Sequence, residues 1–371
     1  MEEKHQVRSG DKNDRPWIER VYDASLSIDS LSFEMGAVFV TADIPVKAPT
    51  IILLTTAQTI ADSLNVTESG RTLSLTWKVG ISRLVGQYYI EIQVPPHSIA
   101  SITSACSGII AVYPKVLKQH SGVAIKSQGS ARILIEDTDL QAEKLDLSLT
   151  GPGVLQVACT TATIAGALDV SSTGSGTLAF FASSLSASHT AVSATGSGKT
   201  HVLIKSTANI TDSLDVKTTG SGAVVLNADA LSTHDCSAAA FGSGVVEIGS
   251  ESQFFASKLK AKVTGSGQIK CIGNGSSTKQ KFEVTGSGSI HSSLDATADC
   301  VVKITGSGNV YLPPNQTFAP HTAGSGKVFP FQGVERSAVY TMCLMPVPAP
   351  HELDYIPVLG PVQWLPKTLF G

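Results

Sequence analysis

The chain has 371 residues with a formal net charge of -3 and a sequence pI near 6.3. A chain with this net charge lacks the excess of positive charge that is typical of proteins that bind nucleic acid or an anionic membrane. Charged residues make up 15% of the chain, against about 25% in ordinary soluble proteins. Glycine, serine, threonine, alanine and valine fill the difference, which favours short strands and tight turns. Because the sequence holds no apolar run of about 18 residues, we expect no transmembrane segment.

Residues 1 to 16 are polar and unpatterned, so we expect a disordered N-terminal tail. They lack the apolar stretch of a secretory signal, so the sequence as written indicates an intracellular protein. Cysteines are scattered along the chain without a Cys-x-x-Cys pair, which favours reduced thiols that pack as small apolar side chains. They are Cys106, Cys159, Cys236, Cys271, Cys300 and Cys343.

Residues 17 to 104 predict strands of a looser period than the rest of the chain. The β-prone segments are Ala37–Val40, Ile51–Leu54, Leu73–Trp77 and Tyr88–Ile92. The open end of a repeat array invites pairing with other strands, so an atypical terminal segment is expected there. We therefore interpret residues 17 to 104 as an N-terminal β cap.

A Thr-Gly-Ser-Gly unit returns through residues 105 to 336. From Gly108 to Gly326 it makes about ten intervals that average close to 22 residues. Self-similarity at such a period is typical of a stacked array. The copies begin at Thr173, Thr195, Thr219, Thr264, Thr285 and Thr305, with degenerate copies at Thr150, Phe241 and Ala323.

Counted from the last glycine of each copy, positions +2 and +4 are mostly apolar, as in Val224 and Leu226. Position +3 admits polar and aromatic residues: Gln156, His201, Glu247, Lys270, His291 and Tyr311. This alternation predicts a strand with one buried face. A second alternating stretch leads into each copy, so each repeat is predicted as strand, glycine turn, strand and a less regular return.

A single coil of this kind cannot bury its inward residues, whereas coils stacked at about 4.8 Å share a continuous core. We therefore predict an all-β fold, a parallel β-helix of about ten to eleven coils, right-handed from the chirality of strand crossovers. After the repeats, residues 337 to 371 contain prolines that exclude a regular helix or central strand. We expect an irregular Pro-rich C-terminal tail there.

The paired glycines of the repeat are predicted to turn a sharp corner, which needs the positive φ angles that glycine adopts freely. The threonines and serines beside them would stack as hydroxyl ladders. On this interpretation Gly220→Val damages folding locally and touches no active site. The structural turn residues are Gly151, Gly153, Gly174, Gly176, Gly196, Gly198, Gly220, Gly222, Gly242, Gly244, Gly265, Gly267, Gly286, Gly288, Gly306, Gly308, Gly324 and Gly326.

One copy, Gly196–Thr200, imitates a nucleotide-binding loop, with Lys199 in the place of the phosphate-binding lysine. That chemistry needs a helix after the loop, and the residues from His201 to Ile204 are β-prone instead. Nucleotide binding through this segment is therefore an alternative that the sequence does not favour, and we expect no cofactor.

Carboxylates are the remaining candidates for chemistry. Asp146, Asp169 and Asp215 share one phase of the repeat, and such a column could hold calcium. The same column is filled elsewhere by Ala191, Ser237, Lys260 and Lys281, so a solvated face is the simpler account. Glu247 and Lys270 are in phase on adjacent coils and are expected to pair. His201 and His291 are too many coils apart to share a metal.

The chain resembles the auto-transporter adhesin, head GIN domain family over residues 20 to 330. The resemblance is carried by Leu73–Leu75, Tyr89–Pro95, Ser98–Ile102 and Cys106–Gly108, followed by tandem Gly-Ser-Gly turns. Those turns begin at Gly174, Gly196, Gly220, Gly242, Gly265, Gly286 and Gly306. The resemblance implies a right-handed β-helix and a surface-exposed, non-catalytic role at the cell surface or outside the cell.

The sequence therefore predicts a non-enzymatic β-helical scaffold of the adhesin-head type, which presents an extended surface to a protein partner or a carbohydrate. It names no catalytic and no metal-binding residue, and no nucleic-acid partner is expected. The alternative is a carbohydrate-active enzyme, a polysaccharide lyase or hydrolase, on the same fold. That enzyme would need two carboxylates with a base gathered in one outward cleft.

Overall fold

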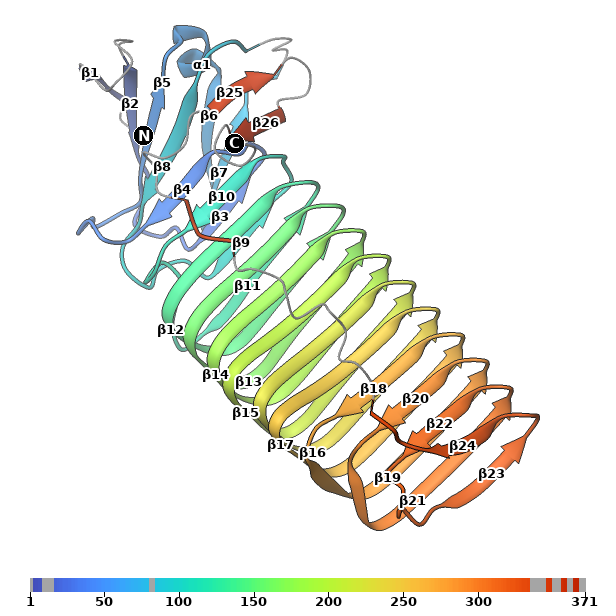
Figure 1. The fold of residues 1–371 in the computed structure, drawn as a ribbon. Helices are drawn as coiled ribbons and strands as arrows, with labels where there is room; N and C mark the ends of the chain where they lie inside the picture. Colours follow the sequence, from blue (N-terminus) through green and yellow to red (C-terminus); the bar gives the residue numbers. More distant parts are fainter. Residues whose placement is uncertain are drawn as a thin grey trace. The chain divides into compact units, whose positions relative to one another are not determined.

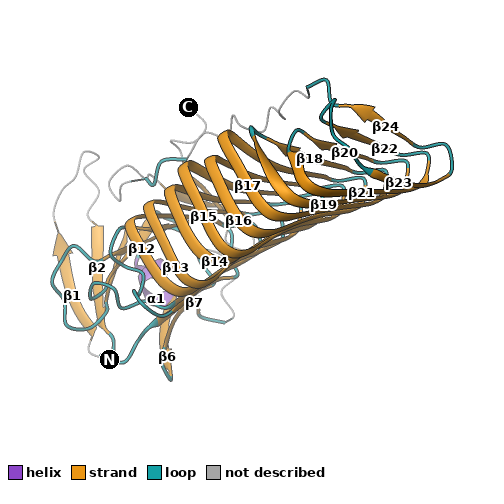
Figure 2. Ribbon diagram, turned by 90° about the horizontal axis from the view of Figure 1, so that it is seen from below, coloured by secondary structure: helices purple, strands orange, loops and turns teal. Residues whose placement is uncertain are grey.

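A computed structural model describes residues 3–8, 17–79, 84–333, 345–348, 355–358 and 363–366. Strands make up 71% of it and helix 2%, and stacked parallel coils form a β-solenoid of about ten turns. The all-β solenoid predicted from the repeat is therefore confirmed, and Figure 2 shows its strands following one another as neighbouring ribbons. In the described part of the chain, no helix has the length and apolar character needed to cross a bilayer.

The chain divides into two compact units. Unit 1 comprises Met1–Thr138, Gly153–Val157 and Met345–Gly371. Its elements are β1 (Glu3–Arg8), β2 (Trp17–Asp23), β3 (Ser30–Phe33), β4 (Val38–Thr41), β5 (Thr50–Thr55), α1 (Gln58–Ser63), β6 (Leu64–Ser69), β7 (Thr72–Trp77), β8 (Tyr88–Gln93), β9 (Ser101–Ser104), β10 (Ile109–Val112), β11 (Gly122–Gln128), β25 (Tyr355–Val358) and β26 (Gln363–Pro366). All four strands expected between residues 17 and 104 are present, as β4, β5, β7 and β8.

Unit 1 combines antiparallel and parallel pairing. The antiparallel part runs β1–β2–β5–β8, with the hairpin β6–β7 beside it. Parallel pairing joins β3 to β7 and β9, β4 to β8 and β10, and β9 to β11. Coil stacking therefore begins before residue 105. The pairing of β1 also means that the disorder expected for residues 1 to 16 does not extend to this strand; residues 1–2 and 9–16 lie outside the described part.

Unit 2 comprises Asp139–Pro152 and Ala158–Leu344. Its strands are the latter parts of β12 (Arg132–Thr150) and β13 (Val154–Gly174), then β14 (Thr177–Gly196), β15 (Lys199–Gly220), β16 (Ala223–Gly242), β17 (Val245–Gly265), β18 (Gln268–Ile272), β19 (Gly275–Gly286), β20 (Ser289–Ser292), β21 (Asp295–Gly306), β22 (Asn309–Leu312), β23 (Ala319–Ala323) and β24 (Lys327–Pro330). From β14 to β17 each strand pairs in parallel with the next. Figure 1 shows that two series of shorter strands then continue the stack.

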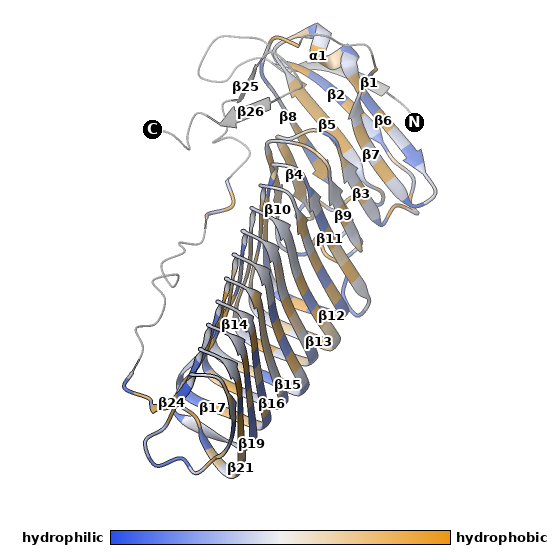
Figure 3. Ribbon diagram, turned by 90° about the vertical axis from the view of Figure 1, so that its right-hand side faces the viewer, coloured by the Kyte–Doolittle hydropathy of each residue, from blue (hydrophilic) through white to orange (hydrophobic). Residues whose placement is uncertain are grey.

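The core of unit 2 is built from columns of inward residues, one from each coil. Position +2 is such a column, in which Val224 pairs in register with Val246 and Val246 with Ile269. Phe180, Phe254 and Phe282 are the largest fully buried side chains of the unit. Figure 3 shows the resulting alternation of hydrophobic and hydrophilic residues along the strands. Stacking in register thus buries what no single coil could bury.

Each corner needs both of its glycines, for different reasons. The first glycine has a positive φ angle, +111° at Gly220. The last glycine does not, but a Cβ at Gly222 would lie 2.5 Å from the carbonyl oxygen of Gly198 in the preceding coil. The Gly196 carbonyl oxygen accepts two hydrogen bonds from the next corner, from the N–H groups of Ser221 at 3.0 Å and Gly222 at 2.9 Å. The corners therefore stack backbone against backbone.

The return between corners is more regular than the sequence indicates. β15 and β16 run from one corner to the next as continuous strands of 22 and 20 residues. Their pairing shifts register twice, between Ile204 and Thr207 and between Ile210 and Ser213. Each shift places one extra residue on β15, as a β-bulge does. Two bulges therefore absorb the two-residue difference in strand length.

The C-terminal tail is described only in part. β25 and β26 pair antiparallel with each other, and residues 345–348 form no regular element. The rest of residues 337 to 371 lies outside the described part of the chain, so the boundary at residue 337 stays a prediction.

Candidate binding face

Unit 2 carries a polar outward face on the strand segments that lead into the glycine corners. In β17, Lys258, Lys260 and Lys262 are exposed, while the alternate residues Leu259 and Ala261 are buried. Neighbouring strands continue this pattern in register. Because parallel strands lie about 4.8 Å apart, the outward side chains form straight rows that cross the strands.

The row through Lys260 changes charge along its length. It comprises, in register from β14 to β21, Ala191, Asp215, Ser237, Lys260, Lys281 and Val301. The phase assigned to this column from the sequence is therefore confirmed from Ala191 to Lys281. The carboxylate of the row lies on β15 and its lysines lie on β17 and β19, so the row is acidic near one end and basic near the other.

One carboxylate of the possible calcium column, that of Asp169, is engaged in an ion pair. Asp169 accepts an ion pair from the Lys144 ammonium at 2.7 Å, and both side chains are partly exposed. That contact raises the pKa of Lys144, first through the hydrogen bond to Asp169. Within the part of the chain that is described, no three His, Cys, Asp or Glu side chains gather as a group that could hold a metal ion.

Six lysines gather on three neighbouring strands of the outward face. We name them the lysine cluster: Lys258, Lys260 and Lys262 on β17, Lys279 and Lys281 on β19, and Lys303 on β21. Glu283 lies among them and pairs with Lys281 at 2.7 Å. The hydrogen bond from Lys281 lowers the pKa of Glu283, and the positive charges of Lys262 and Lys303 add to the effect. The local potential is therefore positive, although the chain is negative overall.

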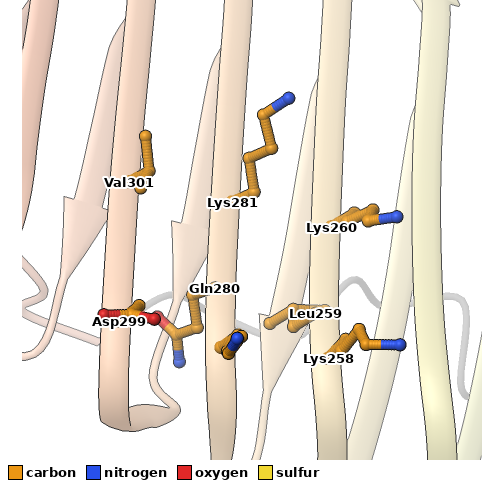
Figure 4. Close-up of a pocket in the computed structure, with 8 residues that line it drawn as sticks. Lys258, Leu259, Lys260, Gln280, Lys281, Asp299 and Val301 are labelled. Atoms are coloured by element: carbon orange, nitrogen blue, oxygen red, sulfur yellow. The ribbon is translucent and has the colours of Figure 1, made fainter.

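A depression of about 270 Å³ lies within the lysine cluster. Four of its lysines line it, together with Leu259, Gln280, Asp299 and Val301. Figure 4 shows these residues on neighbouring strands, with the side chains of Lys258, Lys260 and Lys281 extending from the ribbon. The depression offers ammonium groups as donors and one carboxylate as an acceptor.

Position +3 is buried over much of its length, which corrects the expectation of a single buried face. His201 and Glu247 are 0% exposed, and Gln156 and Lys270 are also buried. The predicted pairing of Glu247 with Lys270 is confirmed, with 3.7 Å between Oε2 and Nζ. His291 is less deeply buried and stacks on Tyr311, with ring centroids 4.3 Å apart. Polar side chains at +3 are therefore interior groups.

Gln156, in unit 1, shows one way in which a +3 side chain is satisfied. Its Nε2 donates a hydrogen bond to the Met345 carbonyl oxygen at 2.8 Å, and the Met345 N–H donates to its Oε1 at 3.1 Å. The side-chain amide of Gln156 thus both donates to and accepts from the backbone of residue 345, as the backbone of a paired β-strand does. The alternation of apolar residues in the sequence carries no signal of this contact, because it involves residues 189 positions apart.

Burial of His201 makes the stability of the fold dependent on pH. Neither ring nitrogen has a hydrogen-bond partner within the described residues. Burial, aided by the positive charge of Lys199, lowers the pKa of His201 from 6.5 to about 4. Above pH 6.5 the ring is neutral in both states. As the pH falls from 6.5 to 4, only the unfolded chain takes up the proton, so stability is lost.

We expect this effect of His201 to remove about 3 kcal/mol of the free energy of unfolding between pH 6.5 and pH 4. Urea denaturation at a series of pH values measures it, with the parent compared with His201→Phe. The variant is expected to lose less stability over this window than the parent. His189→Gln, at an exposed histidine, is the control. Parallel pH profiles for the parent and His201→Phe would show that His201 does not carry the effect.

The loop that imitates a nucleotide-binding motif has no free amides to offer a phosphate. The N–H groups of Ser197 and Gly198 donate to the Gly174 carbonyl oxygen, and that of Lys199 donates to Gly176. Thr200 is buried and hydrogen-bonded to the Ser172 hydroxyl. A strand, β15, follows the loop where a phosphate-binding loop needs a helix. Gly196–Thr200 is therefore a corner like its sister copies.

The motif threonines and the cysteines also have structural positions. Thr195 pairs in register with Thr219, and Thr264 with Thr285. Among the described residues these threonines make no hydroxyl hydrogen bonds along the axis. They are therefore aligned from coil to coil but do not form a hydrogen-bonded ladder. Five cysteines are free thiols, four of them buried. Burial raises the pKa of Cys271 to about 12, so this thiol stays protonated. Cys343 lies outside the described part.

The fold and the outward face together define a β-solenoid repeat protein. At each outward position of its strands, the equivalent side chains of successive coils form one row. The profile of the family described as "Putative auto-transporter adhesin, head GIN domain" matches residues 47–227 and 251–331. The chain belongs to this family, which confirms the resemblance seen in the sequence.

Several solved structures are similar to this chain. One, from Parabacteroides distasonis ATCC 8503, is described as a putative lipid binding protein; it is 16% identical over 85% of this chain and 97% of its own, with a TM-score of 0.34. A putative adhesin from Parabacteroides merdae ATCC 43184 is 11% identical over 85% and 96%, with a TM-score of 0.35. A putative adhesin from Parabacteroides distasonis ATCC 8503 is 12% identical over 85% and 96%, with a TM-score of 0.36. No curated protein matches the sequence.

Proposed function

We propose that this protein is a non-enzymatic scaffold of the adhesin-head kind, whose outward face binds a protein or carbohydrate partner. The observation that carries the proposal is the register of unit 2. Strands β14 to β17 pair over nearly their whole length, so their outward side chains form continuous rows. A rigid face of this kind suits contact with an extended partner, and solenoids use such surfaces for binding.

Membership in the adhesin head family supports the proposal. The chemistry of the face supports it as well, because three of its carboxylates lie apart from one another and each pairs with a lysine. Asp169 pairs with Lys144, Asp235 with Lys258, and Glu283 with Lys281. A glycoside hydrolase of the usual kind needs two carboxyl groups flanking one bond. The depression in the lysine cluster is lined by one carboxylate, that of Asp299.

Binding and turnover measured on the same samples test the proposal. The full chain is immobilised and exposed to a panel of neutral and acidic polysaccharides and to whole cells. We expect saturable binding to at least one member of the panel, with no new reducing ends and no unsaturated sugars after long incubation. Release of shortened or unsaturated products would identify an enzyme, and absence of binding to every member would refute the scaffold role.

A further inference from the structure

The lysine cluster places like charges directly opposite each other. Lys258 is in register with Lys279, and Lys260 with Lys281, on paired strands. Like charges opposite one another on a sheet destabilise it. Lys262 and Lys303 lie opposite Glu283 instead. The two contacts between like charges gain the fold nothing, and features that oppose folding are typical of functional surfaces.

The protein itself neutralises only part of the cluster, chiefly through Glu283, which attracts Lys262 and Lys303 as well as Lys281. Lys258 pairs with Asp235 and Lys281 pairs with Glu283. The other members, Lys260, Lys262, Lys279 and Lys303, have no carboxylate oxygen within 4.0 Å among the described residues. All six lysines are exposed. The cluster therefore presents several ammonium groups that an anionic ligand can reach.

We propose that the lysine cluster binds a linear anionic polysaccharide, one that carries carboxylate or sulfate groups. This inference rests on the proposed function and names the class of ligand. The backbone positions of these residues form a grid, spaced about 4.8 Å across the strands and about 6.6 Å between alternate residues of one strand. Long lysine side chains, with three donors each, adapt to anionic groups that recur along a polymer.

The composition of the cluster favours a polysaccharide over a nucleic acid. Asp235 and Asp299 lie on its border, in one row with Lys258 and Lys279. Carboxylates accept hydrogen bonds from the hydroxyl groups that a polysaccharide carries on its sugars, whereas the backbone of DNA offers no such donors. None of the described residues that line the depression is aromatic, and single-stranded nucleic acids are bound on aromatic stacking platforms.

The test measures binding of the full chain to heparin and to alginate, as sulfated and carboxylated probes, with neutral dextran as a comparison. We expect saturable binding to at least one charged probe and none to dextran, weakening as salt rises. The variant Lys260→Gln/Lys281→Gln is expected to raise Kd by about tenfold or more. It is also expected to lower the slope of log K against log salt by about two.

A second cluster variant, Lys262→Gln/Lys303→Gln, repeats the measurement at two other positions in case the first variant misfolds. The matched control is Lys205→Gln/Lys327→Gln, which removes the same charge from exposed lysines outside the cluster. Thermal unfolding checks that the two cluster variants and the control variant are folded. A control that weakens binding as much as the cluster variants would overturn the inference, since diffuse charge would then explain the binding.

Duplex and single-stranded DNA, measured at the same salt, separate the two kinds of polyanion. Tighter binding of either DNA than of both charged polysaccharides would overturn the polysaccharide assignment. Binding only to a neutral polysaccharide or a cell surface, unchanged in the cluster variants, would overturn this inference and leave the proposed function standing. No binding to any polysaccharide or cell would refute both.

Discussion

Replacing Gly220 with valine is expected to lower the free energy of unfolding by about 3 to 5 kcal/mol. Two causes act together at this corner. The φ angle of +111° is strained for any residue with a Cβ. A Cβ there would also lie 2.6 Å from the carbonyl oxygen of Gly196, so the coils would have to separate. Urea denaturation followed by circular dichroism measures the loss.

The matched control for Gly220→Val is Ser221→Ala, one residue further along the same corner. The Ser221 side chain is exposed, and this change is expected to cost less than about 0.5 kcal/mol. Hydrogen exchange shows where in the fold Gly220→Val acts. The N–H groups of Ser243 and Gly244 donate to the Gly220 carbonyl oxygen, so they should lose protection from exchange. A Gly220→Val protein that unfolds like the parent would show that the corner is not constrained.

Removing the charge of Glu247 is expected to destabilise the fold by about 3 to 5 kcal/mol. The side chain of Glu247 is 0% exposed and that of its partner Lys270 is 9% exposed. In Glu247→Gln the buried ammonium of Lys270 loses this carboxylate, and a buried charge is costly without its counter-charge. Urea denaturation of Glu247→Gln measures the loss, and that of Glu247→Leu, Lys270→Met and their double variant gives the coupling energy.

The double variant Glu247→Leu/Lys270→Met is expected to recover most of that loss, because a buried ion pair replaced by apolar side chains is often neutral in stability. Asp235→Asn is the control, since the ion pair of Asp235 with Lys258 is exposed and worth less than about 1 kcal/mol. If Glu247→Gln cost no more than Asp235→Asn, burial would not govern the strength of the pair.

Local features of the repeat were sufficient to predict the corners and the core. The phase of the glycines placed Val224 and Leu226 inward, and both are buried. It also brought Glu247 opposite Lys270, because a constant phase makes residues far apart in sequence into neighbours. Both inferences depend on alternation within one coil and on its repetition, and these are properties that a sequence displays directly.

The burial of position +3 could not be predicted in the same way. His201 and Glu247 have the polarity of surface residues, and alternation alone assigns them to the outward side of the strand. At the same position of another coil, Gln156 contacts the backbone of Met345, 189 residues further along the chain, and no local pattern records such a contact.

The lysine cluster was hidden for another reason. Lys258, Lys260 and Lys262 are visible as alternate residues, but a net charge of -3 conceals their concentration. Lys279 and Lys303 keep the phase of the glycine corners, in register with Lys258 and Glu283 respectively. The cluster therefore becomes visible only when charges at this phase are compared across three coils, which alternation within one coil does not record.

The bulges in β15 have a consequence for how such a protein changes over generations. Its two extra residues are accommodated between corners, and the residues of β16 return to register before Gly242. An insertion or deletion of one residue in the return is therefore absorbed within its own coil, whereas one at a corner shifts every later coil. The outward residues of one coil can thus change without altering the register of the other coils. Duplication of a whole coil would lengthen the array, and the flanking coils would still pair with a coil of the same pattern.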